Sequence, residues 1–234
     1  MKRIYLLAVL LLLVSCAQYR YVAEDAPAVE DVTLIMPYSR VFYIDQEGEH
    51  YDEAGSDEQQ KLLTGLLLSS GLGITDTVDV VGLPNQKNLD WEIESLPRIN
   101  HKRMGEIVFE GALDKFLESK GARYGLIVFS EGFIKDRKLY KKEVAKIVLM
   151  GVAFGAIGAL AGGAIGGVFV DPNFSMSYEA TPGWAYGSSL NAMLVDTQTG
   201  QVLFYNKILP VERNPLKPEA LASQLQKLFR KYPR

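Results

Sequence analysis

The stretch Leu194-Val195-Asp196-Thr197-Gln198-Thr199-Gly200-Gln201-Val202-Leu203-Phe204 places a polar turn between two apolar runs. Residues 190–195 and 202–205 have the composition of strands, and a polar loop of this length ending in glycine predicts a β-hairpin. Gly200 supplies a positive φ at no steric cost, and Asp196 or Thr197 can bond local backbone amides. We therefore predict a hairpin whose turn contains Asp196, Thr197 and Gly200.

Strand and helix patterns alternate along the rest of the chain. The continuous apolar run 124–129 predicts a strand covered on both faces. Short strands are expected at 32–36, 40–45 and 78–83, with irregular backbone over 84–100. Helical spacing predicts three helices, one after the capping-box pattern Ser56-Asp57-Glu58-Gln59, one from Asn100 to Gly121 and one from Pro218. This interleaving predicts the α/β class, as a single domain with a mixed sheet flanked by helices.

The N-terminus has the pattern of an export signal. Two basic residues precede an uncharged run at 4–14, which is too short to span a hydrocarbon core of about 30 Å. The run ends in Leu13-Val14-Ser15-Cys16, which resembles the lipobox of bacterial lipoproteins. The resemblance implies that residues 1–15 are a signal peptide, that Cys16 is acylated and that the chain is held at a membrane. An ordinary secretory signal with a stray cysteine and a buried core helix are the alternatives.

The resemblance to lipoproteins also implies an address and a domain plan. Ala17 follows the cysteine instead of aspartate, and by the sorting rule of enteric bacteria this implies the outer membrane, with the protein facing the periplasm. Residues 16–31 carry four acids, a proline and little apolar periodicity, so we expect an acylated N-terminus followed by a flexible spacer. Residues 32–234 would then form the periplasmic α/β domain.

Charge and cysteine content exclude several functions. The formal charge is 25 minus 28, or −3, and dropping Lys2 and Arg3 with the first 15 residues leaves 23 minus 28, or −5. No overall basic field is present to hold nucleic acid. The single cysteine excludes intramolecular disulfides, cysteine-based zinc sites and iron–sulfur clusters. We expect no cofactor and no metal.

A glycine-rich apolar insertion, predicted to be helical, occupies residues 147–170 and carries no charge. At about 1.5 Å per residue a helix of this length would reach roughly 36 Å, enough to cross a bilayer. Small residues recur at every fourth position, as in membrane helix pairs, and we predict membrane or oligomer contact at these positions: Gly151, Gly155, Ala159, Gly163 and Gly167. The alternatives are a helical hairpin that packs on the protein's own sheet and a mobile loop.

The C-terminal half has a recognisable order of motifs. A helix is followed by Gly121-Ala122-Arg123-Tyr124, an apolar strand, the long insertion, the hairpin with Asp196, Thr197 and Gly200, and a closing amphipathic helix. This order resembles the periplasmic α/β lipoproteins related to the curli secretion lipoprotein and to the activators of penicillin-binding proteins. The resemblance implies a non-enzymatic adaptor or assembly role, with an envelope protein or a second copy as partner. The glycine-rich insertion departs from the family pattern.

Catalytic patterns are weak in this sequence. His50 lies in an acidic turn and His101 begins a helix, and we expect both to be solvated. Glu92 and Glu94 would serve a cell-wall or glycan hydrolase only if folding brought two carboxyls together, and this is the enzymatic alternative. Trp184 and Tyr186 could line a ligand-binding module, although core packing is the expected role.

Overall fold

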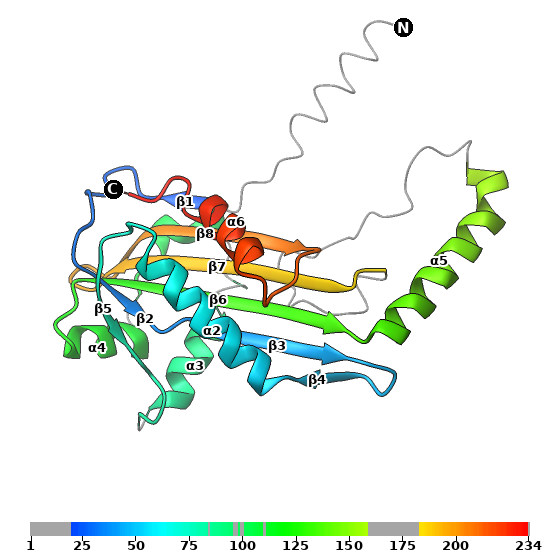
Figure 1. Cartoon of the computed structure of the whole chain (residues 1–234). Coiled ribbons are helices and arrows are strands. Elements are labelled where there is room, and N and C mark those ends of the chain that lie inside the picture. Colours follow the sequence, from blue (N-terminus) through cyan, green and yellow to red (C-terminus); the bar gives the residue numbers. More distant parts are fainter. Residues whose placement is uncertain are drawn as a thin grey trace, which may run out of the picture.

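The computed structural model describes residues 20–83, 85–95, 98, 101–109, 111–158 and 183–233, with the backbone alone at 101–103 and 148–158. One eight-stranded sheet forms the centre, and five α-helices, α2 to α6, accompany it (Figure 1). The elements are, in chain order, β1 Arg20–Val22, β2 Val32–Ile35, β3 Tyr38–Ile44, β4 Glu49–Tyr51, α2 Glu53–Leu68, β5 Ile74–Val78, α3 Gln86–Ser95, the 3-10 helix η2 His101–Glu106, α4 Ala112–Ser119, β6 Tyr124–Lys135, α5 Arg137–Gly158, β7 Tyr186–Asp196, β8 Gln201–Val211 and α6 Pro218–Leu228.

The sheet is mixed, as predicted. Its order is β1-β8-β7-β6-β2-β5, and β6, β7 and β8 form an antiparallel meander. The long strand β6 has two successive parallel neighbours, since β2 pairs with its first residues and β3 pairs with its second half. At the far end β4 pairs only with β3. The predicted α/β fold class, with one mixed sheet flanked by helices, is therefore confirmed.

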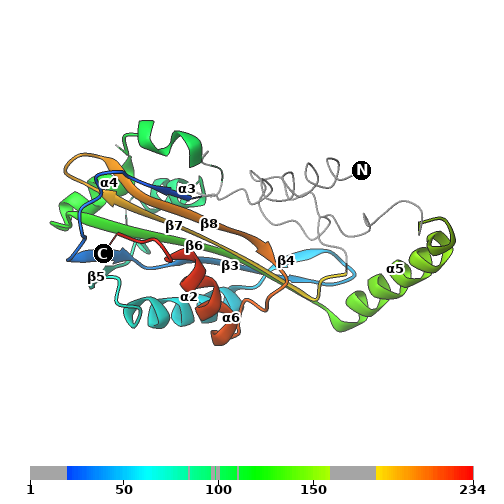
Figure 2. The same cartoon turned by 90° about the horizontal axis from the view of Figure 1, so that it is seen from above.

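Helices cover both faces of the sheet (Figure 2). Alternate residues of β6 point to opposite faces, so Leu126 and Val128 join the core beneath α2 and α6, whereas Ile127 and Phe129 join the core beneath α3 and α4. Nearly the whole of β6 is buried for this reason. The prediction of a strand covered on both faces is confirmed, and the strand continues past residue 129 to Lys135.

Helix α2 begins earlier than its predicted capping box. Asp52 is the N-cap, and its side chain accepts a hydrogen bond from the backbone N–H of Gly55 at 3.0 Å. Ser56 lies inside the first turn, where its hydroxyl donates to the Asp52 carbonyl at 2.7 Å and accepts from the Val41 N–H at 2.9 Å. The capping-box prediction is wrong because the serine hydroxyl joins α2 to β3 instead of capping the helix.

Three further expectations need correction. The helix predicted from Asn100 to Gly121 is divided into η2 and α4, because Val108 bridges to Gln201 and the Phe109 N–H donates to the Gly200 carbonyl at 2.6 Å. The irregular segment predicted at 84–100 contains α3, whose inward side carries Leu89 and Ile93. In addition, the strand predicted at 78–83 lies instead at Ile74–Val78.

Part of the segment 16–31, which is predicted to be a flexible spacer, belongs to the folded domain. Arg20–Val22 forms the edge strand β1, which pairs antiparallel with β8, and Val29 is buried in the core. Cys16 lies outside the described residues.

Candidate functional site

Helix α5 projects beyond the end of the sheet instead of lying along a face (Figures 1 and 2). It follows directly on β6, since Lys135 ends the strand and Arg137 starts the helix. The last described turns of α5 contain Gly151 and Gly155 of the predicted contact row, which are helical there. Ala159, Gly163 and Gly167 lie outside the described residues. We call α5 the arm, and the residues that fix its first two turns the root.

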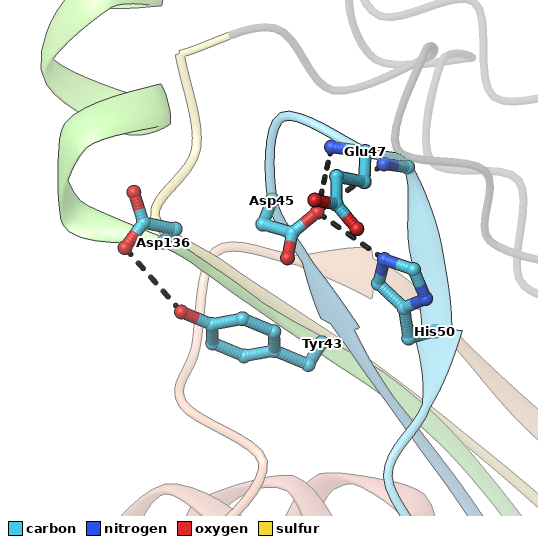
Figure 3. A network of polar contacts seen from close by, with 6 residues as sticks. Tyr43, Asp45, Glu47, His50 and Asp136 are labelled. Carbon is cyan, nitrogen blue, oxygen red and sulfur yellow. Dashed lines mark hydrogen bonds and ion pairs between the residues drawn. The ribbon is translucent and has the colours of Figure 1, made fainter.

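The helix start is capped by Asp136. Its carboxylate accepts hydrogen bonds from the backbone N–H groups of Lys138 at 2.8 Å and Leu139 at 3.1 Å. It also accepts a hydrogen bond from the Tyr43 hydroxyl at 3.3 Å, which Figure 3 shows. The Asp136 N–H donates to the Ile44 carbonyl at 2.7 Å. The arm is thereby joined to β3 as well as to β6.

These contacts shift the acid–base properties of the root. The backbone hydrogen bonds from Leu139 and Lys138 lower the pKa of Asp136, because they stabilise the carboxylate. Desolvation and the nearby Asp136 carboxylate raise the pKa of Tyr43, so its hydroxyl stays a donor to Asp136 at neutral pH. The cap therefore keeps its full charge at neutral pH.

A buried ion pair forms the second fixing point of the root. Lys135 Nζ donates to Glu143 Oε2 at 2.7 Å, and the Lys135 side chain is 0% exposed. The same carboxylate oxygen accepts from the Gly183 N–H at 3.2 Å, which ties the chain that returns to β7. Around the pair lies a small apolar cluster of Ile44, Phe133, Phe42, Leu139 and Trp184.

The acidic turn beside the root is held by its own hydrogen bonds. Asp45 accepts from the Glu47 N–H at 2.8 Å and lies 3.2 Å from His50 Nε2 (Figure 3). The Glu47 N–H is the main cause that lowers the pKa of Asp45, and His50 adds to it. Within the described ranges no group of three His, Cys, Asp or Glu side chains is arranged to hold a metal ion.

The predicted turn residues lie at the opposite end of the sheet. Asp196 pairs with Tyr124 at the start of β6, whereas the arm follows the end of β6. Gly200 has φ +66°, Asp196 accepts from the Gln198 N–H at 2.9 Å, and the Thr197 hydroxyl donates to the Ala122 carbonyl at 2.7 Å. These contacts close the hairpin and join it to the chain before β6.

The carboxylates considered for hydrolysis are engaged in structural contacts. Glu92 accepts from the N–H groups of Ala112 at 2.5 Å and Leu113 at 2.9 Å, and so caps α4. Glu94 accepts from the Tyr38 hydroxyl at 2.7 Å and lies 3.7 Å from Arg40. Each carboxylate therefore has its own set of structural donors.

The aromatic residues do not form a ligand site as a group. Trp184 is partly buried in the cluster at the root, whereas Tyr186 is 37% exposed on the first residue of β7. His101 begins η2, and its side chain lies outside the described atoms. Sequence reasoning missed Lys135, Asp136 and Tyr43, although Asp136 directly before a helical pattern is an N-cap signal.

In the described part of the chain, no helix combines the length and the hydropathy needed to cross a bilayer.

Comparisons with known proteins give fold likeness alone. No protein-family model matches the chain, and no curated protein matches its sequence. Among solved structures, the PelC dodecamer from Paraburkholderia phytofirmans is 10% identical, with 90% of this chain and 91% of that chain covered and a TM-score of 0.34. The C-terminal domain of LpoB from Salmonella enterica is 12% identical, with 82% and 88% covered and a TM-score of 0.29.

A third solved structure is the lipoprotein GNA1162 from Neisseria meningitidis. It is 10% identical, with 88% of this chain and 99% of that chain covered and a TM-score of 0.31. All three neighbours are bacterial proteins, and one of them is described as a lipoprotein. At these identities and TM-scores the likeness carries no argument about function.

Proposed function

We propose that this chain is a bacterial envelope lipoprotein, acylated at Cys16, whose α/β domain acts without catalysis as an adaptor or assembly factor. The arm and the glycine-rich segment that begins within it would contact a membrane or a second copy. The outer membrane, with the domain facing the periplasm, is the expected location. A cell-wall or glycan hydrolase and a ligand-binding module are the alternatives.

The sequence before the folded part supports the anchor. The only cysteine of the chain ends an uncharged run of export-signal length. Buried acyl methylenes contribute about 0.8 kcal/mol each, so several acyl chains give durable anchoring where one chain is marginal. The residues between Cys16 and Arg20 would reach at most about 14 Å when extended. A lipid at Cys16 would therefore hold the edge of the sheet close to the bilayer.

The observation that carries the adaptor role is the arm itself. Helix α5 extends past the sheet while its root is fixed by the Asp136 cap and the Lys135–Glu143 pair. A helix that leaves the core with a firmly held base presents its far part to something outside the domain. Helix α5 does not lie along the protein's own sheet (Figure 2). This direction favours external contact over a helical hairpin that packs on the sheet.

The state of the carboxylates disfavours the enzymatic alternative. Glu92 receives two backbone N–H groups and Glu94 receives a tyrosine hydroxyl, so both act as structural acceptors. A glycoside hydrolase needs two carboxyls that face one substrate bond across about 5–10 Å. Glu92 and Glu94, the candidates from the sequence, lie two residues apart on α3 and are each held by their own structural donors.

The test is metabolic labelling with radioactive palmitate in a bacterial host. We expect the wild-type chain to be labelled and to begin at Cys16, and the Cys16→Ala chain to be unlabelled. An unlabelled wild-type chain with its first 15 residues intact would overturn the proposal. The Cys16→Ala chain, exported behind a cleavable signal, is then extracted at alkaline pH. Retention in membranes indicates insertion by the arm segment, and release as a monomer would contradict the contact assigned to that segment.

A further inference from the structure

The first ten residues of α5 concentrate positive charge. Residues 137–146 hold five basic residues and one acid, a net charge of +4. All five cations are exposed: Arg137, Lys138, Lys141, Lys142 and Lys146. The one acid, Glu143, is paired with the buried Lys135. The exposed charge of this surface, which we call the basic face, is therefore entirely positive.

Spacing gathers the lysines on one side of the helix. Lys138, Lys141, Lys142 and Lys146 follow one another at steps of three, one and four, so they share a face. Tyr140, Val144 and Ile147 lie on the other side and are partly buried. Leu139, on the first turn, packs in the cluster at the root, so the cationic side is the one that remains open to a partner.

This arrangement costs the isolated helix stability. Lys138 and Lys142, and likewise Lys142 and Lys146, are like charges at i and i+4, which repel each other. Arg137 and Lys138 also lie in the first turn, where a cation opposes the helix dipole. In the described residues, none of the five cations forms an ion pair with a carboxylate. Asp136 offsets part of this charge at the helix start, where it interacts with Lys138, and an anionic partner would offset the rest.

The rest of the chain has the opposite sign. The chain from Cys16 onward has a net charge of −5, so the part outside 137–146 carries −9, since −5 minus 4 is −9. A negatively charged surface would repel that body and attract the basic face. The attraction would therefore orient the domain with its arm toward the surface.

The sequence that follows the basic face indicates which kind of negatively charged surface it binds. An uncharged run starts at Ile147, directly after Lys146, and continues to residue 170. A cationic helix face followed by an apolar run matches a bilayer, in which phosphates border on hydrocarbon. We propose that the basic face of α5 binds the phosphate headgroups of anionic phospholipids. The inference rests on the proposed lipid anchor, which would hold the chain at the same bilayer.

A second copy of this chain offers the competing source of negative charge. The turn between β3 and β4 carries Asp45, which is half-buried, and Glu47 and Glu49, which are exposed. The bilayer is favoured because the basic face borders on an apolar run, which an acidic turn would not match.

The experiment uses the acylated chain reconstituted in vesicles, so that the anchor holds every variant equally. Ala145→Cys, in the middle of the basic face, provides a thiol for an environment-sensitive fluorophore, because acylation blocks Cys16. Gln198→Cys, in the exposed turn at the opposite end of the sheet, is the matched reporter site. Vesicles contain phosphatidylcholine alone or phosphatidylcholine with phosphatidylglycerol, and a headgroup spin label serves as quencher.

We expect the fluorophore at residue 145 to be quenched in phosphatidylglycerol vesicles and not in phosphatidylcholine, and the one at 198 to stay unquenched in both. Quenching should disappear at about 1 M salt, where the Debye length is about 3 Å. The variant K138Q/K141Q/K142Q/K146Q should lose at least tenfold in quenching. The matched variant K61Q/K87Q/K115Q/K231Q removes four exposed lysines elsewhere and should retain it.

Three outcomes would overturn the inference. One is no quenching at residue 145 in anionic vesicles, and another is equal loss in the two quadruple variants. The third is a fluorescence change in pure phosphatidylcholine vesicles that increases with the surface density of the protein and is lost in the variant D45N/E47Q/E49Q. This result would show that the basic face binds a second copy of the chain. Failure of the proposed function is distinguishable, because mass spectrometry of the reconstituted chain shows whether Cys16 carries the lipid, whatever the quenching at residue 145.

Discussion

Lys135 Nζ lies 2.7 Å from Glu143 Oε2 across the junction between β6 and α5. The lysine belongs to the sheet and the glutamate to the second turn of the arm, so the ion pair fixes the direction in which the helix leaves the domain. The Gly183 N–H binds the same oxygen and brings the returning chain to this point. The three groups meet where the arm is attached to the body.

Removing the glutamate should cost more than removing the lysine. Glu143→Ala takes a charged partner from a lysine side chain that is 0% exposed, and we expect the free energy of unfolding to fall by about 3 kcal/mol. Lys135→Met removes the buried charge and fills similar space, leaving a carboxylate that is 21% exposed and can be hydrated. We expect a smaller loss. Urea unfolding of both variants measures the difference. A larger loss of unfolding free energy in Lys135→Met than in Glu143→Ala would contradict this account.

Acid should weaken the root through Asp136. Its pKa is lowered in the folded chain, so the stabilising contribution is complete above the ordinary value of about 3.9 and is lost as pH falls through the lowered pKa. Asp136→Asn keeps a capping oxygen without this titration. We therefore expect the wild-type advantage over the asparagine variant in thermal unfolding to shrink as pH falls below about 4. The pKa of Asp45 is also lowered. Asp45 is present in both the wild-type and the Asp136→Asn chain, so its contribution cancels in the difference between their stabilities.

An unchanged difference between the two chains at every pH would show that the carboxylate charge of Asp136 contributes nothing. Asp136→Ala is the companion variant, because it removes the capping oxygen as well. Its melting temperature should lie below that of the asparagine variant at neutral pH, since alanine accepts no hydrogen bond from the first-turn N–H groups.

The central sheet could be predicted because its signals are local. The run at 124–129 is apolar on both faces, and the turn before Gly200 is closed by its own residues. The divided helix could not be predicted, because the break comes from Phe109 donating to Gly200, a partner far along the chain. Periodicity alone cannot detect a tertiary hydrogen bond of this kind.

The root of the arm illustrates the limit for functional sites. Asp136 could have been found, since a capping residue before a helical run is a local pattern. The Lys135–Glu143 contact could not, because no spacing rule relates the end of a strand to the second turn of a helix. The five basic residues at 137–146 are evident in the sequence. Which of them share one face of the helix depends on the residue at which α5 begins.

Gly200 should be the least replaceable of the turn glycines. It has φ +66°, and a Cβ there would meet Val108 Cγ1 at 2.8 Å and the Phe109 carbonyl at 3.1 Å. Gly121 has a similar φ of +71° with open space around the added atom, so it is the matched control. We expect Gly121→Ala to cost about 1 kcal/mol of stability from the left-handed backbone alone. Gly200→Ala should cost at least about 1 kcal/mol more, because overpacking adds to the same strain.

Equal unfolding free energies for the two glycine variants would show that the segment at 107–109 yields to the new methyl group. Hydrogen exchange at the Phe109 N–H separates the cases. A displaced segment would expose this amide, which now donates to the Gly200 carbonyl at 2.6 Å.

Glu92 should behave as a structural cap and not as a catalytic acid. Its carboxylate binds the first N–H groups of α4, whose N-cap residue, Gly111, has no side chain to do so. Glu92→Ala should therefore lower the free energy of unfolding by about 1–2 kcal/mol and speed hydrogen exchange at Ala112 and Leu113. Glu92→Gln retains one acceptor oxygen and should lose less. A catalytic acid would show the reverse: the glutamine variant would keep normal stability and normal exchange at both amides while losing cell-wall hydrolysis.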